Sequence, residues 1–310
     1  MARKVNEHDL CYIKATGLHD LLVTKEHPIW TKPIIKKVKN LPVYGEPQWV
    51  KAGELKVSDK IALYVPRLGN KEVNEELAYC VGRYLGDGWK TSSNRKLHPY
   101  KYYICAAFDE QEELEEHLTK ANIKFTKSLN KTVAEYNLNI TDNDYFIELI
   151  DNCGRYAKDK HVPTEVYSWS KNSVEALLRG YFDADGNIDK SNNNQRFNSI
   201  SEELIYQIAE LIRAVYHKNV IIDVRYPNES TLIDGREVRQ SVSYSGRFKI
   251  DTPKRSFYEY DEENNIMWVN VRTSKKVLPE NEIVYNLSVS DTHTYVANGL
   301  MVHNCSAFNY

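Results

Sequence analysis

Two segments of this 310-residue chain repeat one helical design, and this repeat restricts the possible folds more than any other feature of the sequence. Residues 76–88 and 176–186 each carry an apolar stripe at helical spacing that ends in an aspartate and a glycine. Each stripe also contains a glycine inside the expected helix, Gly82 or Gly180. A glycine there costs about 1 kcal/mol relative to alanine, so it calls for a packing reason. Two helices whose backbones touch would supply that reason.

An acid stands at the end of each expected helix. If the two helices pack side by side at matching registers, Asp87 and Asp185 arrive together at their ends. Two carboxylates held close together form a site for a hard divalent cation such as Mg²⁺, which prefers oxygen ligands. The sequence therefore predicts a metal site at the ends of a pair of helices.

Strands and a helix follow each motif in a similar order, so each half is expected to be a small α+β unit with a pseudo-two-fold axis between the halves. Strand residues alternate, so one face of each sheet can pack under helices while the other stays polar. The expected segments are Tyr102–Phe108, Gln111–Lys120, Ile123–Leu129 and Ala134–Ile140, then Gln195–Ile200, Ser201–His217, Val220–Tyr226 and Glu237–Ser245.

The two motifs also carry a family resemblance. The second, Leu178 to Gly186, has the sequence LRGYFDADG, and the first, Cys80 to Gly88, has CVGRYLGDG. The pair resembles the two motifs of the LAGLIDADG homing endonucleases, which cut double-stranded DNA at long target sites. The first copy has Leu85 where the second has Asp183, but both copies keep the last acid.

This resemblance implies a site, a cofactor and a partner. In the family the last acid of each motif is a metal ligand, so Asp87 and Asp185 are expected to hold Mg²⁺ (or Mn²⁺), with Gly86 and Ala184 as further members of the metal site. The ions would activate water and neutralise the scissile phosphates. The expected partner is a double-stranded DNA target, the host gene that lacks the insertion.

The same resemblance implies a basic residue near the metals. Lys160, in the run Lys160-His161-Val162-Pro163, lies where such endonucleases carry a lysine before a proline, and an exposed lysine without a role is the alternative. Its counterpart in the second half is either Lys249 or Lys254. Residues 90–95 and 190–196 are rich in Asn, Gln, Lys and Arg, which suit base edges in the major groove, although solvated loops are equally expected of such residues.

A second kind of chemistry is indicated near the C-terminus by His303-Asn304-Cys305. The side-chain amide of an asparagine can attack its own main-chain carbonyl, and this cleaves the following peptide bond if a neighbour stabilises the oxyanion and protonates the leaving amine. His303 stands where that neighbour is needed. Cys305 would be the residue released, and its thiolate is a good acceptor for an acyl group.

The run before this triplet carries the second resemblance. Residues 284–289 and 291–297 alternate in the manner of strands, and Asn298-Gly299 predicts a hairpin that delivers His303 and Asn304. This end resembles the C-terminal end of an intein, a self-splicing insert of the Hint fold. The resemblance gives His303, Asn304 and Cys305 their roles, with His293 as a second assisting histidine. Asn286 departs from the family, which often has Asp there.

A matching block lies near the N-terminus. The run from Leu21 to Thr31 resembles the intein block whose Thr and His, three residues apart, activate the upstream splice junction, and Thr24 and His27 occupy those positions. Residues 49–60 are similar to the next Hint strand and turn. Inteins begin with a nucleophilic Cys or Ser and a few dozen residues before this block, whereas this chain begins Met1-Ala2-Arg3-Lys4 and shows no such segment. The expectation is a split intein with a separate N-terminal intein fragment as partner, and a trimmed start is the alternative.

The two resemblances together predict an all-β Hint splicing domain interrupted by a pseudo-two-fold α+β LAGLIDADG domain. Two functions stay open: an active endonuclease plus splicing, or a splicing or self-cleaving element whose endonuclease part only binds or nicks DNA. The expected ranges are 1–66 and 263–304 for the splicing domain, 67–262 for the endonuclease with repeats of about 67–165 and 166–262, and 305–310 for the start of the host (extein) protein.

The composition of the chain limits which partners it can bind and in which cellular compartment it can act. Lys and Arg number 41 against 43 Asp and Glu, so DNA binding would need local basic patches and should depend strongly on salt. No signal peptide or membrane-length apolar run is present, and no membrane partner is expected. Cys305 must be reduced to act, which favours a cytoplasmic location.

Overall fold

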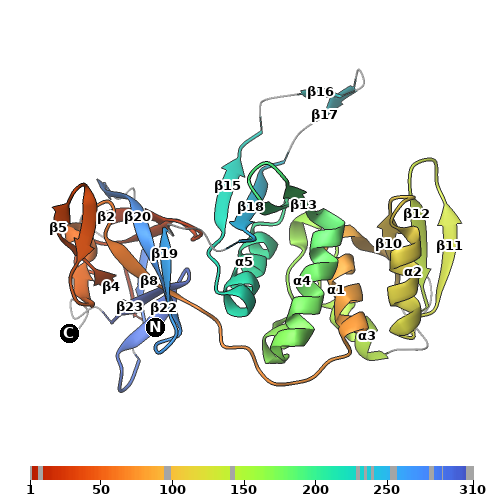
Figure 1. Ribbon diagram of the computed structural model, residues 1–310, viewed down its shortest axis with the longest axis horizontal. Coiled ribbons are helices and arrows are strands. Elements are labelled where there is room, and N and C mark those ends of the chain that lie inside the picture. Colours follow the sequence, from red (N-terminus) through yellow and green to blue (C-terminus); the bar gives the residue numbers. More distant parts are fainter. Residues whose placement is uncertain are drawn as a thin grey trace. The chain divides into compact units, whose positions relative to one another are not determined.

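The structure is a computed structural model in which the chain forms two compact units, residues 1–65 with 252–310 (unit 1) and residues 66–251 (unit 2) (Figure 1). It describes residues 2–5, 10–93, 99–139, 144–227, 231–233, 236–238, 241–251, 257–278, 283–287 and 289–304. Unit 1 is drawn from both ends of the sequence and unit 2 from the middle. This order is the one predicted for a splicing domain interrupted by an inserted domain.

Unit 1 is built from strands, with one short 3-10 helix in its described part. Its elements are β1 (Ala2–Val5), β2 (Leu10–Ala15), β3 (Leu21–Thr24), β4 (Pro28–Lys32), β5 (Ile34–Val38), β6 (Leu41–Tyr44), β7 (Gln48–Lys51), η1 (Ala52–Glu54), β8 (Lys60–Tyr64), β19 (Tyr258–Asp261), β20 (Ile266–Val277), β21 (Ile283–Asn286), β22 (Thr294–Ala297) and β23 (Leu300–His303).

The main sheet of unit 1 joins the two ends of the chain. Its strand order is β22-β23-β4-β8-β20-β2-β3, with β19 beside β20 and β7 beside β4. The contact between β23 and β4 pairs Val302 with Ile29. Both residues are fully buried in the core of the unit. The C-terminal strand before the Asn304 triplet is thereby fixed beside the strand that follows His27.

The β22–β23 hairpin forms as predicted. Its two-residue loop is Asn298-Gly299, and both residues have positive φ, 48° and 82°. Such a turn matches the right-handed twist of the strands that it joins, and asparagine and glycine tolerate its backbone angles best. The hairpin ends with Thr294 opposite His303, so the register of the turn sets where His303 lies.

One predicted boundary is wrong. Residues up to 262 were expected in the inserted domain, but Tyr258–Asp261 forms β19 and pairs in antiparallel register with β20 of unit 1. The second unit therefore ends before β19, at Asp251. The first boundary, expected at 66/67, lies at 65/66.

Unit 2 contains two similar α+β halves. The first has α1 (Glu75–Asp87), β9 (Gly88–Ser92), β10 (Tyr100–Ala106), α2 (Gln111–Lys120), β11 (Phe125–Leu129), β12 (Ala134–Leu138), α3 (Asp144–Asp151), η2 (Ala157–Asp159) and η3 (Thr164–Ser168). The second has α4 (Lys171–Asp185), β13 (Gly186–Asp189), β14 (Asn194–Ser199), α5 (Glu202–Tyr216), β15 (Ile221–Arg225), β16 (Thr231–Ile233), β17 (Arg236–Val238) and β18 (Ser243–Lys249).

Each half has a four-stranded antiparallel sheet, in the order β11-β12-β10-β9 and β13-β14-β18-β15. The predicted succession of strands and helix is found in both halves, and α2 has the predicted bounds. The difference lies in the single strand expected over residues 237–245, which the structure divides between β17 and β18.

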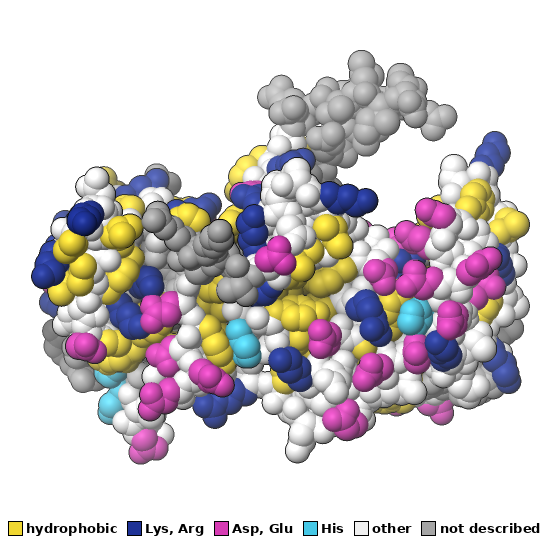
Figure 2. Space-filling view, in the orientation of Figure 1, with side chains coloured by type: hydrophobic (Ala, Val, Ile, Leu, Met, Phe, Trp, Pro, Cys, Tyr) yellow, Lys and Arg dark blue, Asp and Glu magenta, His cyan; other side chains and the backbone are white. Residues whose placement is uncertain are grey.

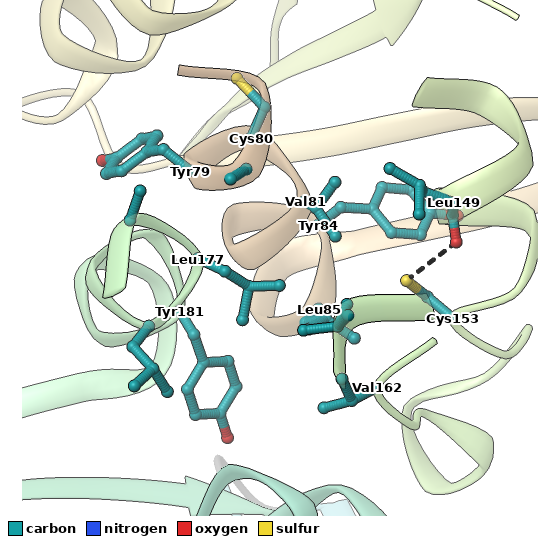
Figure 3. Packing of buried hydrophobic residues seen from close by; sticks show 14 of the residues in the cluster. Tyr79, Cys80, Val81, Tyr84, Leu85, Leu149, Cys153, Val162, Leu177 and Tyr181 are labelled. Carbon is teal, nitrogen blue, oxygen red and sulfur yellow. Dashed lines mark hydrogen bonds between the residues drawn. The ribbon is translucent and has the colours of Figure 1, made fainter. Parts of the chain in front are cut away.

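Helices α1 and α4 run side by side in the middle of unit 2, and the two glycines explain how closely they approach (Figure 1). A Cβ built on Gly82 would lie 2.0 Å from the main-chain oxygen of Leu177, and one built on Gly180 would lie 2.1 Å from that of Tyr79. No side chain fits such a gap, so the predicted reason for the mid-helix glycines is confirmed. Around this contact, α1, α3 and α4 share one apolar core with the loop that carries Val162 (Figure 3).

Candidate functional sites

The two predicted acids lie at the C-terminal ends of the paired helices. Asp87 is the last residue of α1 and Asp185 the last residue of α4. A Cβ built on Gly86 would lie 2.4 Å from the Cβ of Ala184 and 3.3 Å from Oδ2 of Asp185. Position 86 therefore requires glycine, and the Asp185 carboxylate lies against the last turn of α1.

Burial disfavours the charged forms of both acids, and the negative charge of Asp87 further disfavours that of Asp185. Burial raises the pKa of Asp87, and the positive charge of Arg83 opposes this rise. Burial and then the negative charge of Asp87 raise the pKa of Asp185 to about 6. A divalent cation between the two would remove the repulsion, so the pair fits a hard metal ion.

The donor set supports such an ion only with help from other ligands. Two aspartates supply the hard oxygens that suit Mg²⁺ or Mn²⁺. Within the described ranges, no cluster of three or more His, Cys, Asp or Glu side chains is arranged to hold a metal. Further ligands would have to be main-chain oxygens, such as those of Gly86 and Ala184, water, or a bound anion.

Lys160 lies near these acids and is almost completely buried, so the alternative of an exposed lysine is wrong. Its Nζ donates a hydrogen bond of 2.8 Å to the main-chain oxygen of Tyr84 and lies 4.0 Å from the centroid of the Tyr84 ring. Burial lowers the pKa of Lys160 to about 8, although the negative charges of Asp185 and Asp87 act in the opposite direction. The structure thus brings this lysine and both aspartates into one charged cluster.

The second-half lysine is not found there. Lys249, the last residue of β18, donates a hydrogen bond of 2.7 Å to the main-chain oxygen of Asn192. Asn192 lies in the turn between β13 and β14, and β13 runs away from Asp185 toward that turn. Lys249 is therefore at the far end of the hairpin from the acids. Lys254 lies outside the described residues.

Arg83 is a member of the cluster that the sequence did not single out. Only 1% of its surface is exposed, and one guanidinium nitrogen lies 2.8 Å from a carboxylate oxygen of Glu110 and 3.6 Å from one of Asp87. A lone arginine inside an apolar helical stripe was the available signal. What the sequence could not supply is the partner, because Glu110 belongs to a different element.

The second sheet presents a polar face of the expected kind. Phe197 and Phe248 point toward the helices, where they contact the rings of Phe182 and of Tyr216 in α5. The alternate residues Arg196 and Arg247 stand directly opposite each other on neighbouring strands.

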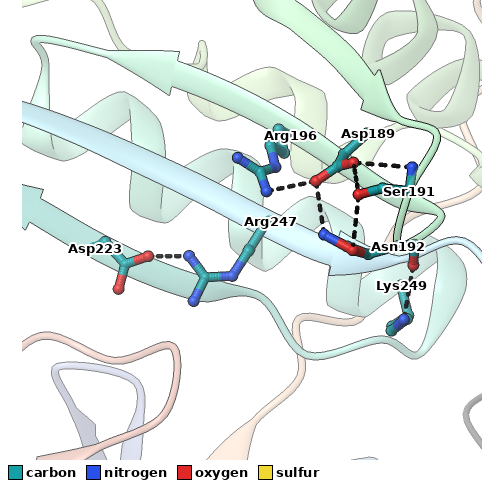
Figure 4. A network of polar contacts seen from close by, with 7 residues as sticks. All are labelled: Asp189, Ser191, Asn192, Arg196, Asp223, Arg247 and Lys249. Carbon is teal, nitrogen blue, oxygen red and sulfur yellow. Dashed lines mark hydrogen bonds and ion pairs between the residues drawn. The ribbon is translucent and has the colours of Figure 1, made fainter.

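Two acids on this face offset the repulsion between these like charges. Asp189 lies 2.5 Å from Arg196 and also binds Ser191 and Asn192, while Asp223 pairs with Arg247 (Figure 4). Residues 190–196 therefore form the turn and strand of an ordered polar face and not a loose loop.

The first half offers a different surface. Lys90 is held by Asp151, whose carboxylate and main-chain oxygens lie 2.6 and 2.8 Å from Nζ, so this lysine is committed to an internal contact. Trp89 and Tyr103 stack with ring centroids 5.2 Å apart. Asn94 and Arg95 lie outside the described residues.

Charges of both signs are mixed over the face drawn in Figure 2, where acidic and basic side chains alternate over α1, α2 and α4. This matches the net charge of −2. None of the helices in the described ranges has the length and apolar character needed to cross a membrane.

A second site lies in unit 1, at the end of β23. The main-chain N–H of Asn304 donates to the oxygen of His293 at 2.7 Å, and its side-chain amide nitrogen lies 3.3 Å from the oxygen of Val289. Nδ1 of His303 lies 2.9 Å from the main-chain oxygen of Asn304. Because a carbonyl oxygen can only accept, Nδ1 of His303 is the donor. The histidine thus holds the carbonyl that the Asn304 amide would attack.

His293 approaches the same amide. Its Nδ1 lies 3.5 Å from the Asn304 amide nitrogen and 2.9 Å from the oxygen of Val289, to which it donates. The rings of His293 and His303 are 5.9 Å apart. His293 itself has a positive φ of 54°, in a tight turn that aims both its oxygen and its ring at Asn304. Cys305 lies outside the described residues.

The Thr24–His27 block lies beside this centre. The N–H of His27 donates to the oxygen of Thr24 at 3.0 Å, which closes a tight turn between β3 and β4. Burial and then the nearby His303 lower the pKa of His27 to about 4, so its imidazole is neutral at physiological pH. Its Nε2 is buried and has no hydrogen-bond partner among the described residues. The two blocks predicted from opposite ends of the sequence thus meet.

A cleft of about 480 Å³ opens next to this turn. The two edge strands of the main sheet, β3 and β22, and residues of β21 line it. Thr24 and His27 form part of its wall. An edge strand carries main-chain groups that can pair with an added strand.

Comparison with known proteins decides the family. The profile of the intein splicing domain family matches residues 4–304. The chain belongs to the intein splicing domain family. The matched range ends at Asn304, the residue that the sequence assigns to cyclisation.

Curated relatives and solved structures are similar over parts of their length. A replication factor C small subunit of Methanocaldococcus jannaschii is 31% identical over 216 residues, 66% of this chain and 11% of the relative. A DNA polymerase of Thermococcus hydrothermalis is 26% identical over 331 residues, 92% of this chain and 19% of the relative. The intein therefore spans between a tenth and a fifth of their length. Variants of the homing endonuclease I-DmoI are 14% identical over 58% of this chain and 85% of theirs, with a TM-score of 0.38.

Proposed function

We propose that this intein excises itself from a host (extein) protein by a Hint-type splicing reaction. The last step that the intein's own residues carry out is cyclisation of Asn304. The observation that carries this proposal is the hydrogen bond from Nδ1 of His303 to the main-chain oxygen of Asn304. As the side-chain amide attacks that carbonyl carbon, negative charge develops on the oxygen that the histidine already holds. The bond to Cys305 breaks, its nitrogen takes a proton, and Asn304 becomes a succinimide.

His293 supports the same step from the other side. Its main-chain oxygen and that of Val289 hold the backbone and amide of Asn304, which limits the side chain to few rotamers. A held nucleophile reacts faster because its orientation entropy has already been lost. His293 is therefore proposed as the residue that positions the attacking amide.

The earlier steps need Thr24, His27 and Cys305. The neutral, buried His27 and the hydroxyl of Thr24 are proposed to promote an acyl shift at an upstream nucleophile, after which the Cys305 thiolate takes over the acyl group. The segment that brings this nucleophile is proposed to be an N-terminal intein fragment that adds a strand between β3 and β22, in the cleft beside Thr24. A free Cys305 thiolate needs a reducing compartment, so we place the protein in the cytoplasm.

Release of a reporter domain tests the cyclisation. The full chain is extended after Tyr310 by a reporter, and the released intein is analysed by mass spectrometry. Release with a succinimide at residue 304 is expected, together with its loss in Asn304→Ala and slowing in His303→Ala. Release that persists in Asn304→Ala would disprove the step.

For unit 2 we propose metal-dependent hydrolysis of double-stranded DNA at the ends of α1 and α4. The carrying observation is that two half-buried carboxylates, Asp87 and Asp185, lie together there with Lys160 close by. Bound Mg²⁺ or Mn²⁺ would supply an activated water and stabilise charge on the phosphate. Lys160 would add positive charge near that phosphate. The polar face around Arg196 would contact the DNA target, the host gene without the intein.

Cleavage of a plasmid that carries the uninterrupted host gene tests this proposal. Conversion of supercoiled to linear DNA is expected in Mg²⁺, with loss on chelation and in Asp87→Asn and Asp185→Asn. Accumulation of nicked circles alone would favour the second candidate, a nicking or binding module. The irregular first motif, with Leu85 in place of an acid, is the feature that favours it.

A further inference from the structure

The two acids of unit 2 stand in unequal surroundings, although the helices that carry them are paired. The motif that ends in Asp87 has Arg83 four residues earlier, and the motif that ends in Asp185 has Tyr181 at that position. Tyr181 is fully buried, and its hydroxyl donates a hydrogen bond of 3.1 Å to the main-chain oxygen of Asn198. One half therefore places a cation behind its acid, and the other half places an uncharged ring there.

Arg83 contacts one acid of the pair directly. It lies 3.6 Å from the Asp87 carboxylate, and Glu110, which is 2.8 Å away, holds its guanidinium in place. Among the described residues no ion pair is formed to Asp185. The positive charges of Arg83 and Lys160 reach Asp185 only through space. The carboxylate of Asp185 is thus the one that lacks a cation in contact.

The burial of Arg83 has a cost that packing does not explain. Its side chain is almost inaccessible, and its Nε–H has no hydrogen-bond partner among the described residues. An unsatisfied buried donor on a charged group is destabilising, and a leucine at this point of an apolar helix would avoid that cost. A charge at this position is therefore better explained by what it does to Asp87 than by the stability of the fold.

We propose that Arg83 is a positioning residue that makes the two halves of the metal site unequal, so that Asp185 holds the first divalent ion and Asp87 receives one only at higher metal concentration. This inference rests on the proposed nuclease function of the site. The Arg83 guanidinium, which also pairs with Glu110, offsets part of the charge of the Asp87 carboxylate and repels a second cation. Near Asp185 the same ion meets a negative charge with no cation in contact.

Metal binding by the full chain tests the order directly, without using cleavage. Mn²⁺ is titrated at pH 8, and binding is followed by calorimetry and by the electron spin resonance signal of free Mn²⁺. The variants are Asp185→Asn, Asp87→Asn, Arg83→Met, which keeps length without charge, and Arg83→Lys, which keeps the charge. Arg179→Met, an exposed arginine on α4, is the matched control.

In the unsubstituted chain one Mn²⁺ should bind more tightly than any second ion. Asp185→Asn should remove the tighter site, and Asp87→Asn should leave it. Arg83→Met should strengthen the weaker site about tenfold, the effect of removing one unit charge a few ångströms from a divalent ion. Arg83→Lys and Arg179→Met should bind as the unsubstituted chain does.

Equal losses in the two aspartate variants, or no change in Arg83→Met, would overturn the inference. Circular dichroism and melting of each variant separate a loss of binding from a loss of fold. DNA cleavage is measured in parallel on the unsubstituted chain. If cleavage is absent while the Mn²⁺ order holds, the proposed nuclease function fails and the role of Arg83 stands. If DNA is cleaved but the two Mn²⁺ ions do not bind in this order, the nuclease function stands and the proposed role of Arg83 fails.

Discussion

The two units of this intein bury opposite kinds of titratable group at their candidate sites. In unit 1 the buried group is a base, His27, whose pKa falls to about 4. In unit 2 the group is a half-buried acid, Asp185, whose pKa rises to about 6. Loss of water around the charged form causes both shifts. At neutral pH the first centre is therefore uncharged at His27, which suits a rearrangement of amides. The second keeps the Asp185 carboxylate ionised beside another aspartate, which suits binding of a cation.

The largest expected effect is the separation of the two activities by single substitutions. Asn304→Ala removes the attacking amide and should reduce release of the Cys305 segment below detection. Asp185→Asn should reduce DNA cleavage by about 100-fold or more, because a charged group at the site of charge development is lost. Each variant is assayed for both reactions. The assignment of the two reactions to separate sites is wrong if the Asn304→Ala variant also loses DNA cleavage while its circular dichroism and melting are unchanged.

The next largest effect concerns the helix contact that exists only in unit 2. Gly82→Ala and Gly180→Ala would each push a methyl group to about 2 Å from a main-chain oxygen of the partner helix. Since overpacking of ordinary core sites costs about 1–3 kcal/mol, we expect about 3 kcal/mol or more here.

Scanning calorimetry of the full chain is the measurement for these variants. The transition of unit 2 should move to lower temperature, and release of the Cys305 segment should persist. Arg179→Ala, an exposed change next to Gly180 that removes a cation–π contact with Tyr79, should alter stability by no more than about 1 kcal/mol. A shift of both transitions would mean that the two units unfold as one.

These contacts show which parts of the molecule the sequence could predict. The pairing of α1 with α4 was predictable because Gly82 and Gly180 carry a local cost that only a close approach explains. The β22–β23 turn was predictable because Asn298-Gly299 suits few other conformations. In both cases the signal lies within a few residues.

Other features depend on pairings between distant segments. The sequence placed residues 258–261 in the inserted domain, whereas they form β19 of unit 1. The pairing of β19 with β20 leaves no local mark in the sequence. The burial of Lys160 and the contact of Arg83 with Glu110 likewise arise from packing between elements. The cleft beside Thr24 needs two edge strands to face each other, which no pattern in one strand predicts.

The pH dependence of stability should have opposite signs in the two units. Between pH 6.5 and 4 the unfolded chain binds a proton at His27 that the folded chain does not, so unit 1 should lose stability as the pH falls. Over nearly the same range, from pH 6 to 3.8, folded unit 2 binds a proton at Asp185 that the unfolded chain does not, so unit 2 should gain stability.

Variants isolate these two groups from the many other carboxylates. Each shift is about two pKa units or more, so each group should contribute on the order of 2–3 kcal/mol between neutral pH and pH 4. His27→Gln should remove that part of the slope in unit 1, and Asp185→Asn should remove the opposite slope in unit 2. Calorimetric scans at a series of pH values measure both. Slope changes of the same sign in His27→Gln and Asp185→Asn would contradict the assignment of these two groups.

The smallest expected effect locates DNA binding within unit 2. Arg196 and Arg247 stand opposite each other on a polar face. In the free protein each arginine pairs with an acid, Asp189 or Asp223. Replacing either arginine by alanine should weaken binding to duplex DNA by about 1–3 kcal/mol if it contacts a base, or lower the salt dependence by about one ion if it contacts a phosphate. Lys171→Ala, at the opposite end of α4 from Asp185, is the control and should change neither. Binding measured at several salt concentrations distinguishes these outcomes, and a loss in Lys171→Ala equal to that in Arg247→Ala would show that the charge of the unit, and not this face, attracts the DNA.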